Sequence, residues 1–210
     1  MMKGFRPGEL YPITSSRNLA GLTHVELARI FLTAGIRFFQ VREKELEDGP
    51  LLDILQQIRN LCADFGAQFI VNDRVDLALA SQARGVHLGQ TDLPVAFARG
   101  VLGEDAVIGI TTHSQDQFRR ALEEPVDYIA CGPVYSTTSK TSQYDPLGQD
   151  FVSWARAQTS LPIVAIGGIT IARAGEVWSA GADSIAVISG IVDAVVPDEA
   201  IRSYMEQRPQ

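Results

Sequence analysis

The stretch LPIVAIGGITIARAGEVWSAGADSIAVISG, residues 161–190, decides the fold. It opens with a short apolar run that ends at Gly167, continues with helical spacing over Ile171–Ala180, and closes with a second apolar run over Ser184–Ser189. Apolar runs this short, without alternating polar residues, predict strands that are buried on both faces. Two such strands joined by a helix indicate a parallel sheet, because parallel neighbours need a long crossover connection.

The same strand–helix unit recurs along the whole chain and predicts an α/β fold, a single (β/α)8 TIM barrel over residues 1–210. An open doubly wound sheet is the alternative, but no glycine fingerprint follows the first predicted strand. The predicted strands are Leu10–Thr14, Phe38–Arg42, Phe69–Asn72, Gly85–Gly89, Val107–Thr111, Tyr128–Gly132, Ile163–Gly167 and Ser184–Ser189. The predicted helices are Leu22–Thr33, Pro50–Phe65, Asp73–Ala80, Leu93–Gly100, Ser114–Leu122, Gln149–Thr159, Ile171–Ala180 and Ile191–Met205, the last with a break at Pro197.

Composition narrows the range of functions. Of the 210 residues, 46% are hydrophobic, yet the apolar runs are far shorter than the roughly 20 residues of a membrane span, so no membrane partner is expected. A net charge of −7 argues against unspecific nucleic-acid binding. Cys62 and Cys131 both lie in apolar surroundings, which predicts buried free thiols and a reducing, cytoplasmic setting. A homo-oligomer is compatible with a barrel this small.

Polar side chains gather at the predicted carboxyl ends of the strands, which form the catalytic face of a barrel. Gln40 and Arg42 share one face of their strand, and Lys44 can continue that face. The guanidinium of Arg42 offers a forked set of donors and the ammonium of Lys44 a compact charge, and together they suit a phosphate or diphosphate. The alternative is a solvated basic edge paired with neighbouring glutamates.

Carboxylates follow two neighbouring strands. Asn72 and Asp73 end one predicted strand, and Asp92 follows the next. Two carboxylates beside a bound diphosphate predict Mg²⁺, which takes one or two carboxylates together with phosphate oxygens. Either aspartate alone could instead be the N-cap of the helix that follows it.

Two further clusters suit a phosphate without needing a cation. The stretch Gly132–Thr141 ends a strand and continues as a loop rich in hydroxyl groups, in which Lys140 is the one cation. Gly167, Gly168 and Ser189 follow the last two strands, where barrels commonly bind phosphate on backbone amides. The alternatives are a solvated loop and a pair of tight turns.

The three histidines show no metal-ligand spacing. His24 is expected on the surface of an early helix, His87 in the core or at the rim, and His113 facing the site. No nucleophile elbow supports a Ser-His-Asp triad.

Taken in order, these motifs resemble those of thiamine-phosphate synthases. The resemblance rests on Gln40-x-Arg42-x-Lys44, Asn72-Asp73-Arg74, the stretch from Gly85 to Asp92 (GVHLGQTD), Gly132-Pro133 with Thr137, Ser139 and Lys140, and Ile166-Gly167-Gly168-Ile169. It extends from about Tyr11 to Ile191.

The resemblance implies a transferase that joins 4-amino-2-methyl-5-hydroxymethylpyrimidine diphosphate to a thiazole phosphate, giving thiamine phosphate and pyrophosphate. It implies a dissociative, Mg²⁺-assisted course, with Arg42, Lys44 and Lys140 as catalytic cations. It assigns the pyrimidine diphosphate to Gln40, Arg42, Lys44, Asn72, Thr111 and Lys140. It assigns the thiazole phosphate to Thr137, Thr138, Ser139, Gly168, Ile188 and Ser189, and Mg²⁺ to Asp73 and Asp92.

Other functions remain open from the sequence. A related thiazole tautomerase shares the barrel but generally lacks the Asn-Asp pair and the later aspartate. A sugar-phosphate isomerase or epimerase needs an acid–base pair more than two cations and two metal-binding acids. A non-catalytic barrel that binds a thiazole phosphate is the third alternative, and metal dependence discriminates it from an enzyme.

Overall fold

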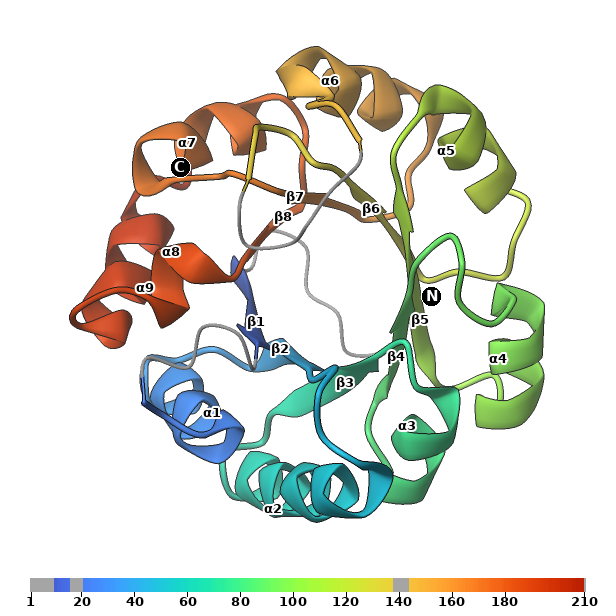
Figure 1. Ribbon diagram of the computed structural model, residues 1–210. Helices are drawn as coiled ribbons and strands as arrows, with labels where there is room; N and C mark the ends of the chain where they lie inside the picture. Colours follow the sequence, from blue (N-terminus) through green and yellow to red (C-terminus); the bar gives the residue numbers. More distant parts are fainter. Residues whose placement is uncertain (1–9, 16–20, 138–143, 210) are drawn as a thin grey trace.

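A computed structural model describes residues 10–15, 21–137 and 144–209, and these form a closed barrel of eight parallel strands in sequential order. The strands form an inner ring and the helices surround it (Figure 1). This confirms the predicted (β/α)8 fold. The strands are β1 (Leu10–Ser15), β2 (Phe38–Arg42), β3 (Gln68–Asn72), β4 (Gly85–Leu88), β5 (Val107–Thr112), β6 (Tyr128–Cys131), β7 (Ile163–Ile166) and β8 (Ser184–Val187).

The helices follow the predicted order, with most of their ends shifted by one or two residues. Helix α2 begins before Pro50, and at the predicted break near Pro197 the chain forms two separate helices. The helices are α1 (His24–Thr33), α2 (Asp48–Asp64), α3 (Val75–Ser81), α4 (Val95–Leu102), α5 (Gln115–Ala121), α6 (Gly148–Gln158), α7 (Ile171–Ser179), α8 (Ser189–Val192) and α9 (Pro197–Glu206).

Two separate apolar cores hold the barrel together. A large one lies between the strands and the surrounding helices, and a small one fills the barrel interior around Tyr11, Phe38 and Tyr128. Gly109 faces the Tyr128 ring so closely that a Cβ there would lie 2.0 Å from a ring carbon. The interior is therefore packed, and any ligand must bind at an end of the barrel rather than inside it.

Local signals in the sequence account for several element ends. Thr23 is the N-cap of α1 in a capping box: its side chain accepts the Glu26 backbone N–H, and the Glu26 side chain accepts the Thr23 backbone N–H. Ser114 is the N-cap of α5. Gly35 follows α1 at φ +93°, a conformation that L side chains rarely adopt.

The expectation that His24 lies on the surface is wrong. Its side chain is 2% exposed and hydrogen-bonds to Thr14 and Glu43. His24 is the first residue of α1, and its side chain points back toward the barrel.

Both cysteines are buried free thiols, as predicted. Burial raises the pKa of each thiol, Cys62 and Cys131, to about 12. In the described part of the chain, no helix combines the length and apolar character needed to cross a lipid bilayer.

Candidate active site

A pocket of about 640 Å³ opens at the carboxyl ends of the strands. It gathers residues that stand far apart in the sequence, because every parallel strand ends on the same face of the barrel. The lining residues that the sequence predicts are Lys44, Asn72, Asp73, Asp92, Thr111, Thr137, Gly168, Ile188 and Ser189.

Two of the predicted residues that the structure describes, Gln40 and Arg42, do not line the pocket. Gln40 is buried in β2 and donates its amide N–H to the Tyr11 hydroxyl at 3.2 Å. Arg42 is half-buried at the end of the same strand, and its backbone N–H reaches the Thr14 Oγ1 at 3.4 Å. Neither is among the residues that line the pocket. Thr138, Ser139 and Lys140 lie outside the described residues.

At one end of the pocket, a cation meets two carboxylates. Lys44 Nζ lies 2.7 Å from Asp73 Oδ2, and the Asp73 and Asp92 side chains are hydrogen-bonded to each other. Asp92 Oδ2 also accepts the Gly89 backbone N–H at 2.6 Å. Neither aspartate caps a helix, because the N-cap residues of α3 and α4 are Arg74 and Pro94. The N-cap alternative is therefore excluded for both residues.

The two carboxyl groups differ in acidity because they interact with each other and only Asp73 forms an ion pair with Lys44. Burial raises the pKa of Asp92, and the neighbouring Asp73 raises it further. Burial also acts on Asp73, but its hydrogen bonds with Asp92 and Lys44 outweigh it and lower the pKa of that carboxyl. Asp73 holds φ at +63°, a strained value for a residue with a side chain. The Asp73 carboxylate therefore reaches Asp92 from a left-handed backbone conformation that is unfavourable for residues other than glycine.

Two clustered carboxylates are the oxygen ligands that a hard divalent cation takes. Among the described residues, no group of three or more His, Cys, Asp or Glu side chains could hold a metal ion. A cation bound to Asp73 and Asp92 would therefore complete its coordination with water or with ligand oxygens.

A buried chain of hydrogen bonds runs from the pocket into the barrel. His87 Nε2 lies 2.6 Å from Thr111 Oγ1, and its Nδ1 lies 2.7 Å from the Tyr128 hydroxyl. The Tyr128 hydroxyl lies 3.1 Å from that of Tyr11, which accepts from Gln40. Burial raises the pKa of both tyrosines, so both phenols stay neutral and can relay hydrogen bonds. Gln40 is thus connected to the pocket through intervening side chains.

The opposite end of the pocket is formed by tight glycine turns. Gly167 and Gly168 adopt φ of +98° and +63°, and a Cβ on Gly168 would lie 2.4 Å from the Ser136 carbonyl oxygen. Only glycine therefore lets the turn after β7 approach the loop after β6. The turn also leads into α7, whose amino end faces the pocket through Thr170.

Arg173 is a functional candidate that the sequence reasoning missed. Its guanidinium lies 4.4 Å from the centre of the Tyr135 ring and donates to the Gly168 carbonyl at 3.3 Å. The Tyr135 hydroxyl accepts in turn from Gln149 at 2.5 Å. Arg173 therefore places a held cation beside the glycine turn, where the sequence suggested that backbone amides alone would suffice. Its position, three residues into a helix, gave no signal in the sequence.

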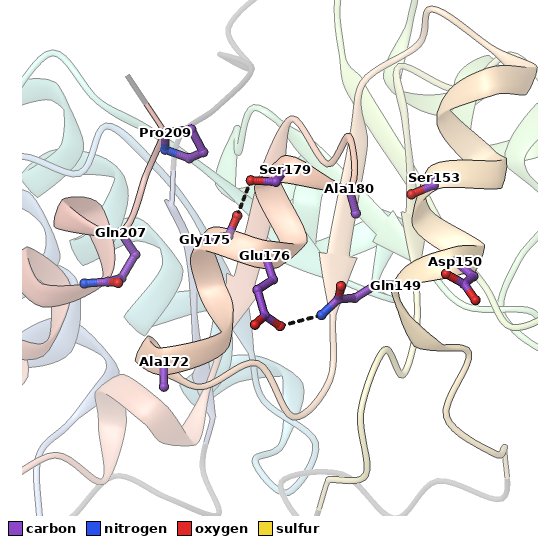
Figure 2. A pocket seen from close by; sticks show the side chains of 10 residues that line it. All are labelled: Gln149, Asp150, Ser153, Ala172, Gly175, Glu176, Ser179, Ala180, Gln207 and Pro209. Carbon is purple, nitrogen blue, oxygen red and sulfur yellow. Dashed lines mark hydrogen bonds between the residues drawn. The ribbon is translucent and has the colours of Figure 1, made fainter.

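A second hollow of about 710 Å³ lies on the outside of the barrel, between α6, α7 and the segment after α9 (Figure 2). It is lined by small residues such as Ala172 and Gly175, and by the hydrogen-bonded pair Gln149 and Glu176 at 2.7 Å. None of the described residues predicted for the site lines it. The candidate active site is therefore the pocket at the strand ends.

The barrel and its pocket define the class of protein. A (β/α)8 barrel whose strand-end pocket has a lysine and two carboxylates at one end, and glycine turns at the other, is an enzyme scaffold for anionic small molecules.

Comparisons with known proteins identify the family within this class. The family model described as "Thiamine monophosphate synthase" matches residues 10–191. A thiamine-phosphate synthase of Methanocella arvoryzae is 43% identical over 88% of this chain and 87% of its own length. The bifunctional thiamine biosynthesis protein ThiM/ThiE of Symbiobacterium thermophilum is 44% identical over 96% of this chain, which spans only 43% of that longer protein.

A solved structure agrees. The thiamine phosphate pyrophosphorylase of Pyrococcus furiosus superposes with a TM-score of 0.87 and 30% identity, covering 96% of each chain. The chain belongs to the thiamine monophosphate synthase family. The resemblance of the sequence motifs to that family is thereby confirmed.

Proposed function

We propose that this chain is a transferase that couples the pyrimidine diphosphate to a thiazole phosphate, with release of pyrophosphate. The observation that carries the proposal is one pocket that has Lys44 at one end and the Gly168 turn with Arg173 at the other. Lys44 with the aspartate pair suits a diphosphate, and the Gly168 turn with Arg173 suits a single phosphate. Two anionic substrates bound in this way would meet over the middle of the pocket.

The aspartate pair fits Mg²⁺. Asp73 and Asp92 would hold the ion, and the diphosphate oxygens would complete its coordination. When bound, the ion would neutralise charge on the leaving pyrophosphate. Lys44 would act on the same charge, because its ammonium already lies at the carboxylate pair. Arg42 and Lys140 are proposed as further cations for this group, on the strength of the family motifs.

The proposed course needs no protein nucleophile. Pyrophosphate would leave first, and the thiazole nitrogen would then attack the pyrimidine methylene carbon. Among the chain's own groups, Thr111 would contact the pyrimidine, and its hydrogen bond with His87 at 2.6 Å would hold its hydroxyl for that contact. Asn72 lines the same side of the pocket and offers an amide for the pyrimidine ring. Thr137, Thr138, Ser139, Ile188 and Ser189 are proposed for the thiazole phosphate.

A coupling assay tests the function. The protein is mixed with both substrates, with Mg²⁺ or with EDTA, and thiamine phosphate and pyrophosphate are followed in parallel. We expect both products in equal amounts and only with Mg²⁺. If the thiazole phosphate alone binds or isomerises and no product forms, a tautomerase or a binding protein replaces the synthase.

Arg173→Ala should raise KM for the thiazole phosphate about ten-fold, because a charge-assisted hydrogen bond to phosphate is lost. KM for the pyrimidine diphosphate should stay unchanged. Steady-state kinetics with each substrate varied in turn measures both values. Arg119→Ala is the matched control, since it removes an exposed arginine stacked on Trp154 at 5.3 Å, outside the pocket. An equal change for both substrates would remove Arg173 from the phosphate end.

We also propose a reducing, cytoplasmic setting, supported by two buried thiols that are not joined. A homo-oligomer stays a prediction, which sedimentation analysis would test.

A further inference from the structure

A buried, hydrogen-bonded side-chain pair lies beside the strand that leads to Lys44. His24 Nε2 lies 2.9 Å from Glu43 Oε2, and both side chains are 2% exposed. The other ring nitrogen of His24 lies 2.7 Å from Thr14 Oγ1. His24 therefore joins the end of β1, the start of α1 and the end of β2, three elements that lie side by side in Figure 1.

The second carboxylate oxygen of Glu43 organises the loop that follows. Glu43 Oε1 accepts the backbone N–H groups of Lys44, Glu45 and Leu46 at 2.7, 2.5 and 3.2 Å. Three successive donors on one oxygen fix the path of the backbone, because each bond restrains a different peptide plane. Burial alone would raise the pKa of Glu43, but the hydrogen bonds from His24, Glu45 and Leu46 hold it below its usual value.

The end of this loop that leads into α2 is also held by a side-chain contact. Asp48 begins α2, and its Oδ1 lies 2.5 Å from Arg74 Nη1, on the residue after Asp73. This pair is exposed and contributes little energy. It nevertheless links the loop to the segment that carries Asp73. Lys44 lies between Glu43 and the Asp48–Arg74 pair, and its ammonium is 2.7 Å from Asp73.

We propose that His24 and Glu43 are positioning residues that fix the loop of residues 43–48, so that Lys44 faces the diphosphate end of the pocket before substrate arrives. The inference rests on the proposed function. It adds two side chains that do not line the pocket and would never touch substrate. Pre-positioning matters because a cation held in place loses less conformational entropy on binding.

The test compares Glu43→Ala with Glu43→Gln. The alanine variant removes the acceptor of all three N–H groups, whereas the glutamine oxygen can still accept them. We expect Glu43→Ala to lower kcat/KM for the pyrimidine diphosphate by on the order of ten- to a hundred-fold, with KM for the thiazole phosphate unchanged. Glu43→Gln should recover most of the loss. His24→Ala should shift the same parameters in the same direction.

Calorimetric binding of inorganic pyrophosphate in the presence of Mg²⁺ gives a readout that does not depend on turnover. We expect Glu43→Ala to weaken this binding about ten-fold and Glu43→Gln to restore it. If Glu43→Ala does not fold, Glu43→Asp takes its place, because the shorter side chain holds the carboxylate away from the loop. Weakened pyrophosphate binding without any synthesis by the wild-type chain would overturn the proposed function and keep the positioning role.

Asp183→Ala is the matched control. Like Glu43, Asp183 combines a basic side-chain partner, here Arg156 at 2.8 Å, with a backbone donor, Ile163 N at 2.7 Å, but it lies at the amino ends of the strands. It should lower Tm and leave the ratio of the two KM values unchanged. If Glu43→Ala merely reproduces this behaviour, or leaves pyrophosphate binding intact, the two residues only stabilise the fold and the proposal is overturned.

Discussion

Replacing Asp92 with alanine should lower kcat by about 10²–10³-fold while leaving the fold intact. The substitution removes one of the two carboxylates that we propose for Mg²⁺, and it leaves Lys44 facing Asp73 alone. Stability should change little, because the side chain lies at the rim and caps no helix. Turnover at saturating Mg²⁺ gives the rate, and Mn²⁺ binding followed by electron paramagnetic resonance gives the metal affinity.

Asp92→Asn separates the effect of losing the carboxylate charge from the effect of losing the hydrogen bond with Gly89. The amide oxygen can still accept the Gly89 N–H, so the turn after β4 keeps its hydrogen bond. Activity should nevertheless stay low, because a neutral amide is a weaker ligand for a hard cation. Asp116→Ala, which removes an aspartate on the exposed face of α5, should have no effect on either readout. Unchanged Mg²⁺-dependent turnover in Asp92→Ala would place the metal elsewhere.

The second large effect is expected at the other end of the pocket. Gly168→Ala should lower kcat/KM for the thiazole phosphate by about 10²-fold. Its Cβ would lie 2.4 Å from the Ser136 carbonyl oxygen and 2.8 Å from Tyr135 Cβ, so the loop after β6 must move. That loop carries Thr137, and Tyr135 holds Arg173. Steady-state kinetics with the thiazole phosphate varied gives the value.

Gly66→Ala provides the control for backbone strain. Gly66 has φ +59°, close to the +63° of Gly168, but a Cβ there would meet nothing within 4 Å. Both variants should lose about 1–2 kcal/mol of folding free energy from the left-handed backbone alone. Only Gly168→Ala should lose more, and only it should change the kinetics. Equal losses in the two variants, with equal kinetics, would contradict a close-packed phosphate turn.

The fold could be predicted from the sequence because each strand of a parallel barrel carries its own signal. Runs such as Ile163–Gly167 are continuous and apolar, which is what burial on both faces requires, and they recur at intervals that leave room for a helix. Pro197 marked the break between α8 and α9 for a local steric reason. Only the ends were displaced, as at α2, because a proline in the first turn permits a helix that begins before it.

The site could be predicted only in part, because side-chain direction depends on tertiary contacts. Asp73 and Asp92 could be predicted because they follow the ends of two parallel strands, and all parallel strands end on the same face of the barrel. The prediction for His24 was wrong because a polar residue at a helix start is usually solvated, whereas here the carboxylate of Glu43, 19 residues along the chain, hydrogen-bonds to it inside the protein. Arg173 was missed because its partner, Tyr135, comes from a different strand end. Contacts between residues so far apart in the chain have no signal in the local sequence pattern.

The burial of both native thiols has a practical consequence for spectroscopy. Cys62 and Cys131 are 3% and 0% exposed, and they account for all the cysteine in the chain. A thiol with a pKa of about 12 is almost entirely protonated at neutral pH, and so reacts slowly with maleimides or iodoacetamide. A cysteine introduced at an exposed position such as Gln158 would therefore take a fluorophore selectively, with no need to remove the native cysteines.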